Sequence, residues 1–278
     1  MSHPYRSVLY LPGSRERVLE KAKGLAADAL IFDLEDAVAP EDKLSARELV
    51  CEMVQRGYGA RKRLIRINDL ETEWGEADLE AAIEASPDGI LIPKVSSAEG
   101  LRAIATHLKG DTRLWAMMET PLGILNAKEI AASTPVLEGF VMGTNDLVKE
   151  LFASHTPDRA PVMTSLSLCL LAARAHGLIC VDGVYNAFKD EDGLRKECQQ
   201  GLEMGFDGKT LIHPAQVAPA NEVFAPDEAE LALARRYIEA FENASGVAVV
   251  DGKIVENLHV ENAVRLLAKA DMISKMNN

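Results

Sequence analysis

Residues 29–36 read Ala-Leu-Ile-Phe-Asp-Leu-Glu-Asp, an apolar run followed by the acids Asp33, Glu35 and Asp36. The apolar residues are continuous rather than alternating, which is typical of a strand buried on both faces of a parallel sheet. Acidic side chains directly after such a strand lie at its carboxyl end, where α/β proteins build their ligand sites. This stretch therefore predicts a parallel α/β architecture and the edge at which its chemistry lies.

Seven further runs of the same kind predict an eight-stranded barrel. The eight predicted strands are Ser7–Leu11, Ala29–Asp33, Arg63–Ile67, Gly89–Pro93, Leu114–Met118, Gly139–Gly143, Leu178–Val181 and Lys209–Ile212. Helical patterns separate them, and the first of these helices, Arg15–Lys23, has Ser14 as its predicted N-cap. Eight strands alternating with helices predict a closed (β/α)₈ barrel, the TIM-barrel fold. A doubly wound open sheet is the alternative, weakened because no Gly-x-Gly-x-x-Gly follows the first strand.

The last part of the chain does not continue this repeat. Its pattern predicts a helix, a β-hairpin with a type I′ turn and a final helix: Asp227–Asn243, Val247–Val255 around Asp251-Gly252, and His259–Lys275. We therefore divide the chain into a barrel, residues 1–225, and a C-terminal hairpin-helix arm, residues 226–278. Because a hairpin and one helix bury little apolar surface alone, we expect the arm to pack on the barrel and on a neighbouring subunit.

Composition narrows the class of protein. The chain of 278 residues is 47% hydrophobic and carries a net charge of −13, which argues against binding to nucleic acid or to anionic membranes. We expect a cytoplasmic enzyme, because no apolar stretch approaches the length of a membrane span and the first residues do not resemble a signal peptide. The four cysteines form no Cys-x-x-Cys pair, which favours reduced thiols.

Two acids are candidate metal ligands. Glu119 follows the fifth predicted strand and Asp146 follows the sixth, so both lie at the carboxyl ends of adjacent strands. Two carboxylates completed by water and substrate oxygens suit Mg²⁺, with Mn²⁺ as a second possibility, and the absence of neighbouring His or Cys disfavours zinc. The alternative is that both acids are hydrogen-bond acceptors behind the site.

Candidate cationic groups lie near the same strands. Arg66 interrupts an apolar strand, where a guanidinium needs a planar anion: either a ligand carboxylate or an acid of residues 33–36 in a structural ion pair. We count Arg66 and Asp36 as candidate catalytic residues. The candidates for binding substrate phosphates or carboxylates are Arg6, Lys94 and Arg15, the last of which lies at the predicted start of a helix.

Seven motifs occur in an order that resembles one enzyme family. They are residues 6–13, residues 32–38, Arg66-Ile67-Asn68, Ile92-Pro93-Lys94, Met118-Glu119-Thr120, residues 143–147 and Ile212-His213-Pro214. Together they are similar to the citrate lyase β-subunit-like family of CoA-ester lyases, within the HpcH/HpaI aldolase superfamily, which includes malyl-CoA and citramalyl-CoA lyases. The resemblance covers essentially the whole chain.

The resemblance implies a (β/α)₈ barrel with a C-terminal arm, assembled as a homotrimer or homohexamer. It implies that Glu119 and Asp146 bind Mg²⁺ and that Arg66 grips a carboxylate or carbonyl of a CoA-thioester substrate. In many members an Asp of a Gly-x-Met-Val-Asp-x-Pro stretch on the arm acts as acid or base in the neighbouring subunit's site. The matching stretch here is residues 252–258, in which Glu256 replaces the Asp and Leu258 the Pro.

Three stretches are most similar to the (3S)-malyl-CoA thioesterase subgroup: residues 115–119, 181–188 and 252–260. That similarity implies hydrolysis of (3S)-malyl-CoA to malate and CoA. One alternative is a retro-Claisen lyase that cleaves malyl-CoA, methylmalyl-CoA or citramalyl-CoA to an acyl-CoA and glyoxylate or pyruvate. Others are a metal-dependent aldolase of 2-keto acids that uses no CoA, and a subunit without activity.

Overall fold

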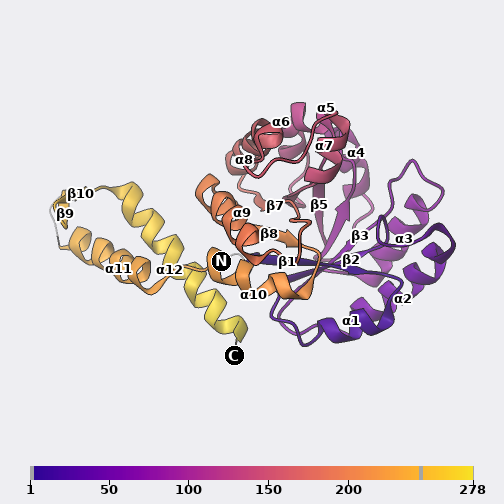
Figure 1. Cartoon of the computed structure of the whole chain (residues 1–278), viewed down its shortest axis with the longest axis horizontal. Coiled ribbons are helices and arrows are strands. Elements are labelled where there is room, and N and C mark those ends of the chain that lie inside the picture. The colour runs from indigo at the N-terminus through magenta and orange to yellow at the C-terminus, as the bar shows by residue number, and fades with distance from the viewer. Residues whose placement is uncertain (1–2, 244–246, 278) are drawn as a thin grey trace. The chain divides into compact units, whose positions relative to one another are not determined.

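The computed structural model describes residues 3–243 and 247–277, which form two compact units. The first, Tyr5–Asn221, contains a closed barrel of eight parallel strands (Figure 1). The strands are β1 (Ser7–Pro12), β2 (Ala29–Asp33), β3 (Lys62–Arg66), β4 (Gly89–Ile92), β5 (Arg113–Met118), β6 (Leu137–Met142), β7 (Ile179–Asp182) and β8 (Gly208–Leu211). Pairing of β1 with β8 closes the barrel, so the predicted fold is confirmed and the open sheet is excluded.

The barrel interior is filled by apolar side chains. They belong to the buried cluster Tyr5, Val8, Ala29, Ile31, Leu64, Leu91, Trp115, Met117, Val141 and Val181. Gly139 on β6 makes room for the largest of them, because a Cβ there would lie 2.6 Å from the Trp115 ring. The continuous apolar runs of the sequence thus reflect strands covered on one face by this interior and on the other by helices.

Helices and short 3₁₀ turns follow each strand of the barrel. They are α1 (Glu16–Ala22), η1 (Pro40–Asp42), α2 (Lys43–Gln55), α3 (Gly75–Ala85), α4 (Ala98–Ala105), α5 (Pro121–Leu125), α6 (Ala127–Ala131), α7 (Thr144–Glu150), η2 (Ala160–Val162), α8 (Met163–Ala175), α9 (Glu191–Met204), η3 (Pro214–Gln216) and α10 (Val217–Phe224). The prediction that Ser14 caps the first helix is wrong. Helix α1 begins at Glu16, so Arg15 occupies the N-cap position, and no side chain caps the helix.

The second compact unit begins at Glu222 and has an apolar core of its own. It contains α11 (Glu228–Glu242), β9 (Ala248–Val250), β10 (Lys253–Val255) and α12 (Asn257–Asn277). One face of the hairpin is buried against α11 and α12, whereas Val249 and Ile254 on the other face are 63% and 61% exposed. Between the strands Asp251 and Gly252 have φ of 50° and 76°, which confirms the predicted type I′ turn.

Within residues 3–243 and 247–277, no helix is both long and apolar enough to cross a membrane. All four cysteines are free thiols; Cys51 is partly buried, and the other three are fully buried.

Candidate active site

An arginine and an aspartate on neighbouring strands form the centre of the candidate site. Arg66 is the last residue of β3 and Asp33 the last residue of β2, and the strand register places the two opposite each other. Their side chains make two parallel hydrogen bonds: Nε to Oδ1 and Nη2 to Oδ2, each 2.7 Å. Arg66 is only 5% exposed, so this pair lies almost wholly out of water at the carboxyl end of the barrel.

The remaining nitrogen of Arg66 faces two more acids. Nη1 lies 3.0 Å from Oε2 of Glu35 and 3.2 Å from Oδ2 of Asp36, and the guanidinium lies over the ring of Tyr10 at 4.9 Å. Burial by itself disfavours the arginine charge, but the attraction of Asp33, together with the Tyr10 and Glu35 side chains, outweighs it and raises the pKa of Arg66 above its usual value. The site therefore contains a permanent cation with a fixed orientation.

Lys94 links this cluster to Glu119. Its backbone N–H donates to Oε1 of Glu119 at 2.8 Å, and its Nζ contacts the carboxylate of Glu35. Lys94 has a φ of 50°, a conformation that is strained for a residue with a side chain. This conformation turns the peptide N–H towards Glu119, which the sequence pattern gave no means of predicting.

Glu119 has the features of a carboxylate that needs a cation. It is fully buried, and its Oε2 has no hydrogen-bond partner among the described residues. Burial, followed by repulsion from Glu35, raises the pKa of Glu119 to about 8, and the charge of Asp146 adds to this repulsion. A divalent cation at Oε2 would reverse both effects, so the residues present fit a metal with oxygen ligands.

Asp146 supplies the second candidate oxygen ligand. Strand β6 ends at Met142, so Asp146 lies in the first turn of α7 rather than at a strand end, and its side chain is half-buried. No group of three or more His, Cys, Asp or Glu side chains arranged to hold a metal occurs in the part of the chain that the structure describes. A site made by Glu119 and Asp146 would therefore leave its other coordination positions to water and substrate, as Mg²⁺ prefers.

The other predicted residues are distributed over both units. Arg15 is exposed just after β1, at the same end of the barrel as Arg66. Arg6 does not agree with its predicted role: it precedes β1, at the opposite end of the barrel, and is buried in a bidentate pair with Asp28 at 2.7 and 2.8 Å. Glu256 is exposed in the second unit, between β10 and α12.

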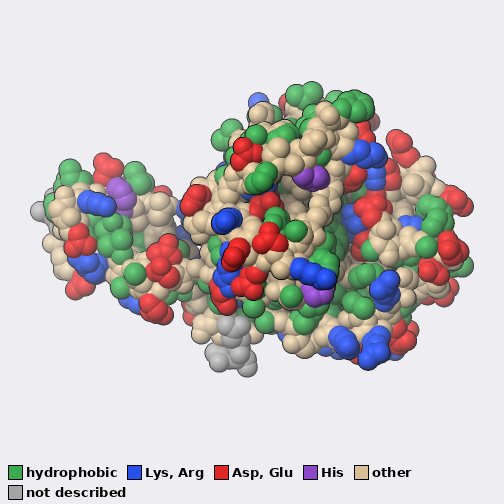
Figure 2. Space-filling model, in the orientation of Figure 1, with side chains coloured by type: hydrophobic (Ala, Val, Ile, Leu, Met, Phe, Trp, Pro, Cys, Tyr) green, Lys and Arg blue, Asp and Glu red, His purple; other side chains and the backbone are tan. Residues whose placement is uncertain are grey.

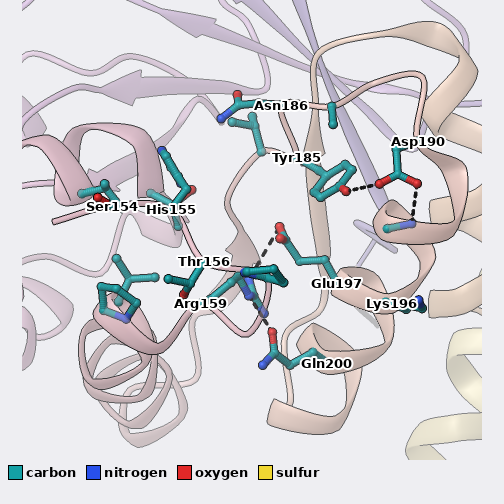
Figure 3. Close-up of a pocket in the computed structure, with 18 of the residues that line it drawn as sticks. Ser154, His155, Thr156, Arg159, Tyr185, Asn186, Asp190, Lys196, Glu197 and Gln200 are labelled. Carbon is teal, nitrogen blue, oxygen red and sulfur yellow. Dashed lines mark hydrogen bonds and ion pairs between the residues drawn. The ribbon is translucent and has the colours of Figure 1, made fainter.

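A cavity of about 680 Å³ lies beside the carboxyl ends of β6 and β7 (Figure 3). Arg159 is one of the residues that line it; its Nη1 binds Asp182 at 2.7 Å and its Nε donates to Gln200 at 2.7 Å. None of Arg66, Glu119 and Asp146 lines this cavity, and Asp182 neutralises its buried cation. We therefore place the candidate site at Arg66 and Glu119. Acidic and basic side chains are mixed over the face seen in Figure 2.

Comparison with known proteins gives consistent matches over most of the chain. The family model HpcH/HpaI aldolase/citrate lyase matches residues 6–214. A (3S)-malyl-CoA thioesterase of Cereibacter sphaeroides is 63% identical, with 98% of this chain and 97% of that protein covered. Citrate lyase subunit beta of Escherichia coli is 34% identical, with 96% and 93% covered.

Solved structures give the same family likeness. The structure of CitE from Mycobacterium tuberculosis in complex with magnesium, acetoacetate and coenzyme A has a TM-score of 0.82 and 29% sequence identity, covering 97% of this chain and 98% of that one. The citrate lyase beta subunit of the same organism, complexed with oxaloacetate and magnesium, has a TM-score of 0.72 and 30% identity, covering 80% and 98%.

Proposed function

Because the chain belongs to the HpcH/HpaI aldolase/citrate lyase family, we propose that it is a Mg²⁺-dependent enzyme that hydrolyses (3S)-malyl-CoA to malate and CoA. The observation that carries the choice of reaction is the 63% identity to a (3S)-malyl-CoA thioesterase over nearly the whole of both chains. The geometry at the mouth of the barrel supports the class of substrate, because a buried, fixed arginine and a carboxylate with one oxygen unpartnered among the described residues together suit a hydroxy-dicarboxylate and a cation.

Arg66 orients the acid end of the substrate in this proposal. Its Nη2 lies 2.7 Å from Asp33, whereas its Nη1 lies 3.2 Å from Asp36 and is held less tightly. We therefore expect a substrate carboxylate to compete with Asp36 for Nη1. Asp36 is the exchangeable partner because its side chain is 68% exposed. Lys94 and Arg15, at the same end of the barrel, are the proposed contacts of the CoA portion; Arg6 no longer belongs to this set.

Glu119 and Asp146 are the proposed Mg²⁺ ligands. When bound, the ion supplies positive charge that holds substrate oxygens and stabilises negative charge developing on them. For the chain itself, the consequence is that the Glu119 carboxylate stays ionised at neutral pH, whereas burial alone favours its protonated form. Magnesium is the ion named in the two solved relatives described above.

Glu256 is the proposed base for hydrolysis. Its carboxylate takes a proton from water, the water oxygen adds to the thioester carbonyl, and the carbon–sulfur bond breaks to release CoA as a thiolate that regains the proton. The backbone around Glu256 is well held, because its N–H donates to Nδ1 of His259 at 3.0 Å at the start of α12. We propose that the protein forms a homotrimer or homohexamer in which Glu256 acts in the site of a neighbouring subunit. We also propose that the enzyme works in the cytoplasm.

The alternative reaction is carbon–carbon bond cleavage, which the 34% identity to citrate lyase subunit beta keeps open. Incubation of the protein with (3S)-malyl-CoA and Mg²⁺, followed by product analysis, separates the two. We expect malate and free CoA, whereas glyoxylate with acetyl-CoA would identify a lyase. Glu119→Gln protein is the matched control, since any product that it forms at the wild-type rate does not come from this site. Activity on free 2-keto acids and none on malyl-CoA would favour the aldolase.

A further inference from the structure

A buried lysine lies directly behind the acids that surround Arg66. Lys43, the first residue of α2, is 6% exposed, and its Nζ donates three hydrogen bonds. The acceptors are the backbone carbonyls of Leu34 at 2.7 Å and Glu35 at 2.6 Å, and Oδ1 of Asn68 at 2.7 Å. All three are neutral oxygens, and they satisfy the full donor capacity of the ammonium group.

These bonds continue into a network that reaches α3. The side-chain amide of Asn68 donates to the Leu34 carbonyl at 2.9 Å and to Oδ2 of Asp78 at 2.6 Å. Asp78 is fully buried and accepts a further bond from Nε of Arg47 at 2.6 Å. The turn after β2 is therefore anchored through Lys43 and Asn68 to two helices outside the barrel.

The two sides of this turn have different partners. The carbonyls of Leu34 and Glu35 face Lys43, whereas the side chains of Asp33 and Glu35 face Arg66 at 2.7 and 3.0 Å. A rotation of the turn that moved the carbonyls would also move the carboxylates. The position of the Arg66 guanidinium thus depends on the hydrogen bonds of Lys43, although the two cations share no direct contact.

We propose that Lys43 is a positioning residue for the substrate-binding arginine. It fixes the Leu34–Glu35 turn so that Asp33 and Glu35 hold Arg66 in the orientation that receives a substrate carboxylate. The inference rests on the proposed function only for the identity of that carboxylate. A merely structural lysine would contribute stability, because loss of a buried donor leaves its acceptors unsatisfied, but it would not affect affinity for the dicarboxylate.

The test compares two buried lysines. Lys43→Met removes the three hydrogen bonds at similar volume, and Lys209→Met is the matched control, because Lys209 is fully buried and binds Asp182 and Glu197, away from Arg66. We expect both variants to unfold at lower temperature. Only Lys43→Met should bind malate at least about tenfold more weakly by calorimetry and raise KM for malyl-CoA more than it lowers kcat.

Two further measurements test the proposed role of Lys43 independently. Asp78→Asn, a milder change two links from the turn, should weaken malate binding by a few-fold without unfolding the protein. Combined with Arg66→Lys, Lys43→Met should add much less than its single effect, because both act on one contact. Wild-type affinity in Lys43→Met, or full additivity, would overturn the proposal.

Failure of the proposed function has a different outcome. If the wild-type protein neither hydrolyses malyl-CoA nor binds malate, the substrate is wrong, and Lys43 is judged from a crystal structure of Lys43→Met. Displacement of Arg66 from Asp33 and Glu35 in that structure supports the positioning role. An unchanged Arg66 refutes it.

Discussion

At the scale of single residues, the site has more negative than positive charge. Three cations, Arg66, Lys94 and Lys43, lie near five carboxylates: Asp33, Glu35, Asp36, Glu119 and Asp146. Burial of Glu119, whose Oε2 has no partner among the described residues, is unfavourable unless a proton or a metal ion compensates it. Burial raises the pKa of both Glu35 and Glu119, and that of Glu119 reaches about 8, so these two carboxyls favour a proton when no cation is present.

Replacing Arg66 tests the proposed substrate clamp. Arg66→Lys keeps a charge but cannot make two parallel bonds to Asp33 and also contact Glu35, because an ammonium is not a planar fork. We expect kcat/KM for malyl-CoA to fall by at least about 100-fold, comparable to removing a preorganised donor from an active site. Steady-state kinetics on protein shown to be folded by circular dichroism measures this.

Arg6→Lys is the control for this variant. It perturbs an equally buried bidentate pair, with Asp28, at the other end of the barrel. We expect a lower melting temperature with kcat/KM within about threefold of wild type, since disruption of a buried ion pair costs a few kcal/mol wherever it lies. Equal losses of activity in both variants would reduce Arg66 to a structural residue.

The pKa of Glu119 predicts how stability depends on pH. The folded protein retains this proton up to about pH 8, whereas the unfolded chain releases it near 4.5. Between these values the folded state binds more protons, so the free energy of unfolding falls as pH rises. We expect metal-free wild-type protein to lose more thermal stability from pH 5 to pH 8 than Glu119→Gln, which has no proton to release.

Magnesium should remove that difference. At pH 8 we expect millimolar Mg²⁺ to raise the melting temperature of the wild-type protein and not that of Glu119→Gln, since a bound ion stabilises the carboxylate form. Melting curves with EDTA and with Mg²⁺ test this. Identical pH profiles, or an equal Mg²⁺ response in both proteins, would contradict the assignment of Glu119 as a ligand.

At the scale of elements, the β9–β10 hairpin determines where Glu256 lies. Gly252 occupies a left-handed position, and a Cβ added there meets nothing within 4 Å, so substitution introduces backbone strain without a clash. We expect Gly252→Ala to destabilise the hairpin by about 1 kcal/mol. Faster amide exchange at Val250 and Lys253, the hydrogen-bonded pair that flanks the turn, measures this.

Gly205→Ala is a matched variant for this experiment. Gly205 ends α9 with a φ of 105°, and a Cβ there is equally unobstructed. Its substitution should cost a similar free energy within the barrel and leave amide exchange in the hairpin unchanged. Protection of the hairpin that responds equally to both variants would mean that the arm does not unfold as a local unit.

At the scale of the whole molecule, subunit exchange tests whether Glu256 acts in the site of its own chain or in that of a neighbouring chain. We predict a trimer or a dimer of trimers and expect Glu256→Ala protein and Arg66→Lys protein, each nearly inactive, to regain activity when mixed. After subunit exchange, some sites combine an intact Arg66 from one chain with an intact Glu256 from another. Native mass spectrometry verifies the exchange. Exchange without regained activity would place Glu256 in its own chain's site or outside catalysis.

The strand pattern was predictable because a continuous apolar run is the mark of a strand that is buried on both faces. All eight predicted strands match the observed ones within about two residues. The positions of Arg66 and Glu119 at the carboxyl ends of β3 and β5 were predictable as well, because they follow from the strand pattern; their roles as substrate clamp and metal ligand stay predictions. The sequence also contained the reason to exclude Arg6. It precedes the first strand, so in a parallel barrel it lies at the end away from the site.

By itself, then, the sequence determined the barrel, the hairpin with its turn, and the end at which the chemistry lies, because these depend on the periodicity and local conformation of adjacent residues. Only the tertiary structure decided how the charges are paired. Lys43 reaches Asn68, and Lys94 turns its N–H to Glu119, across distances in sequence of 25 residues each. Such contacts depend on chain packing and strained backbone, which no local pattern encodes.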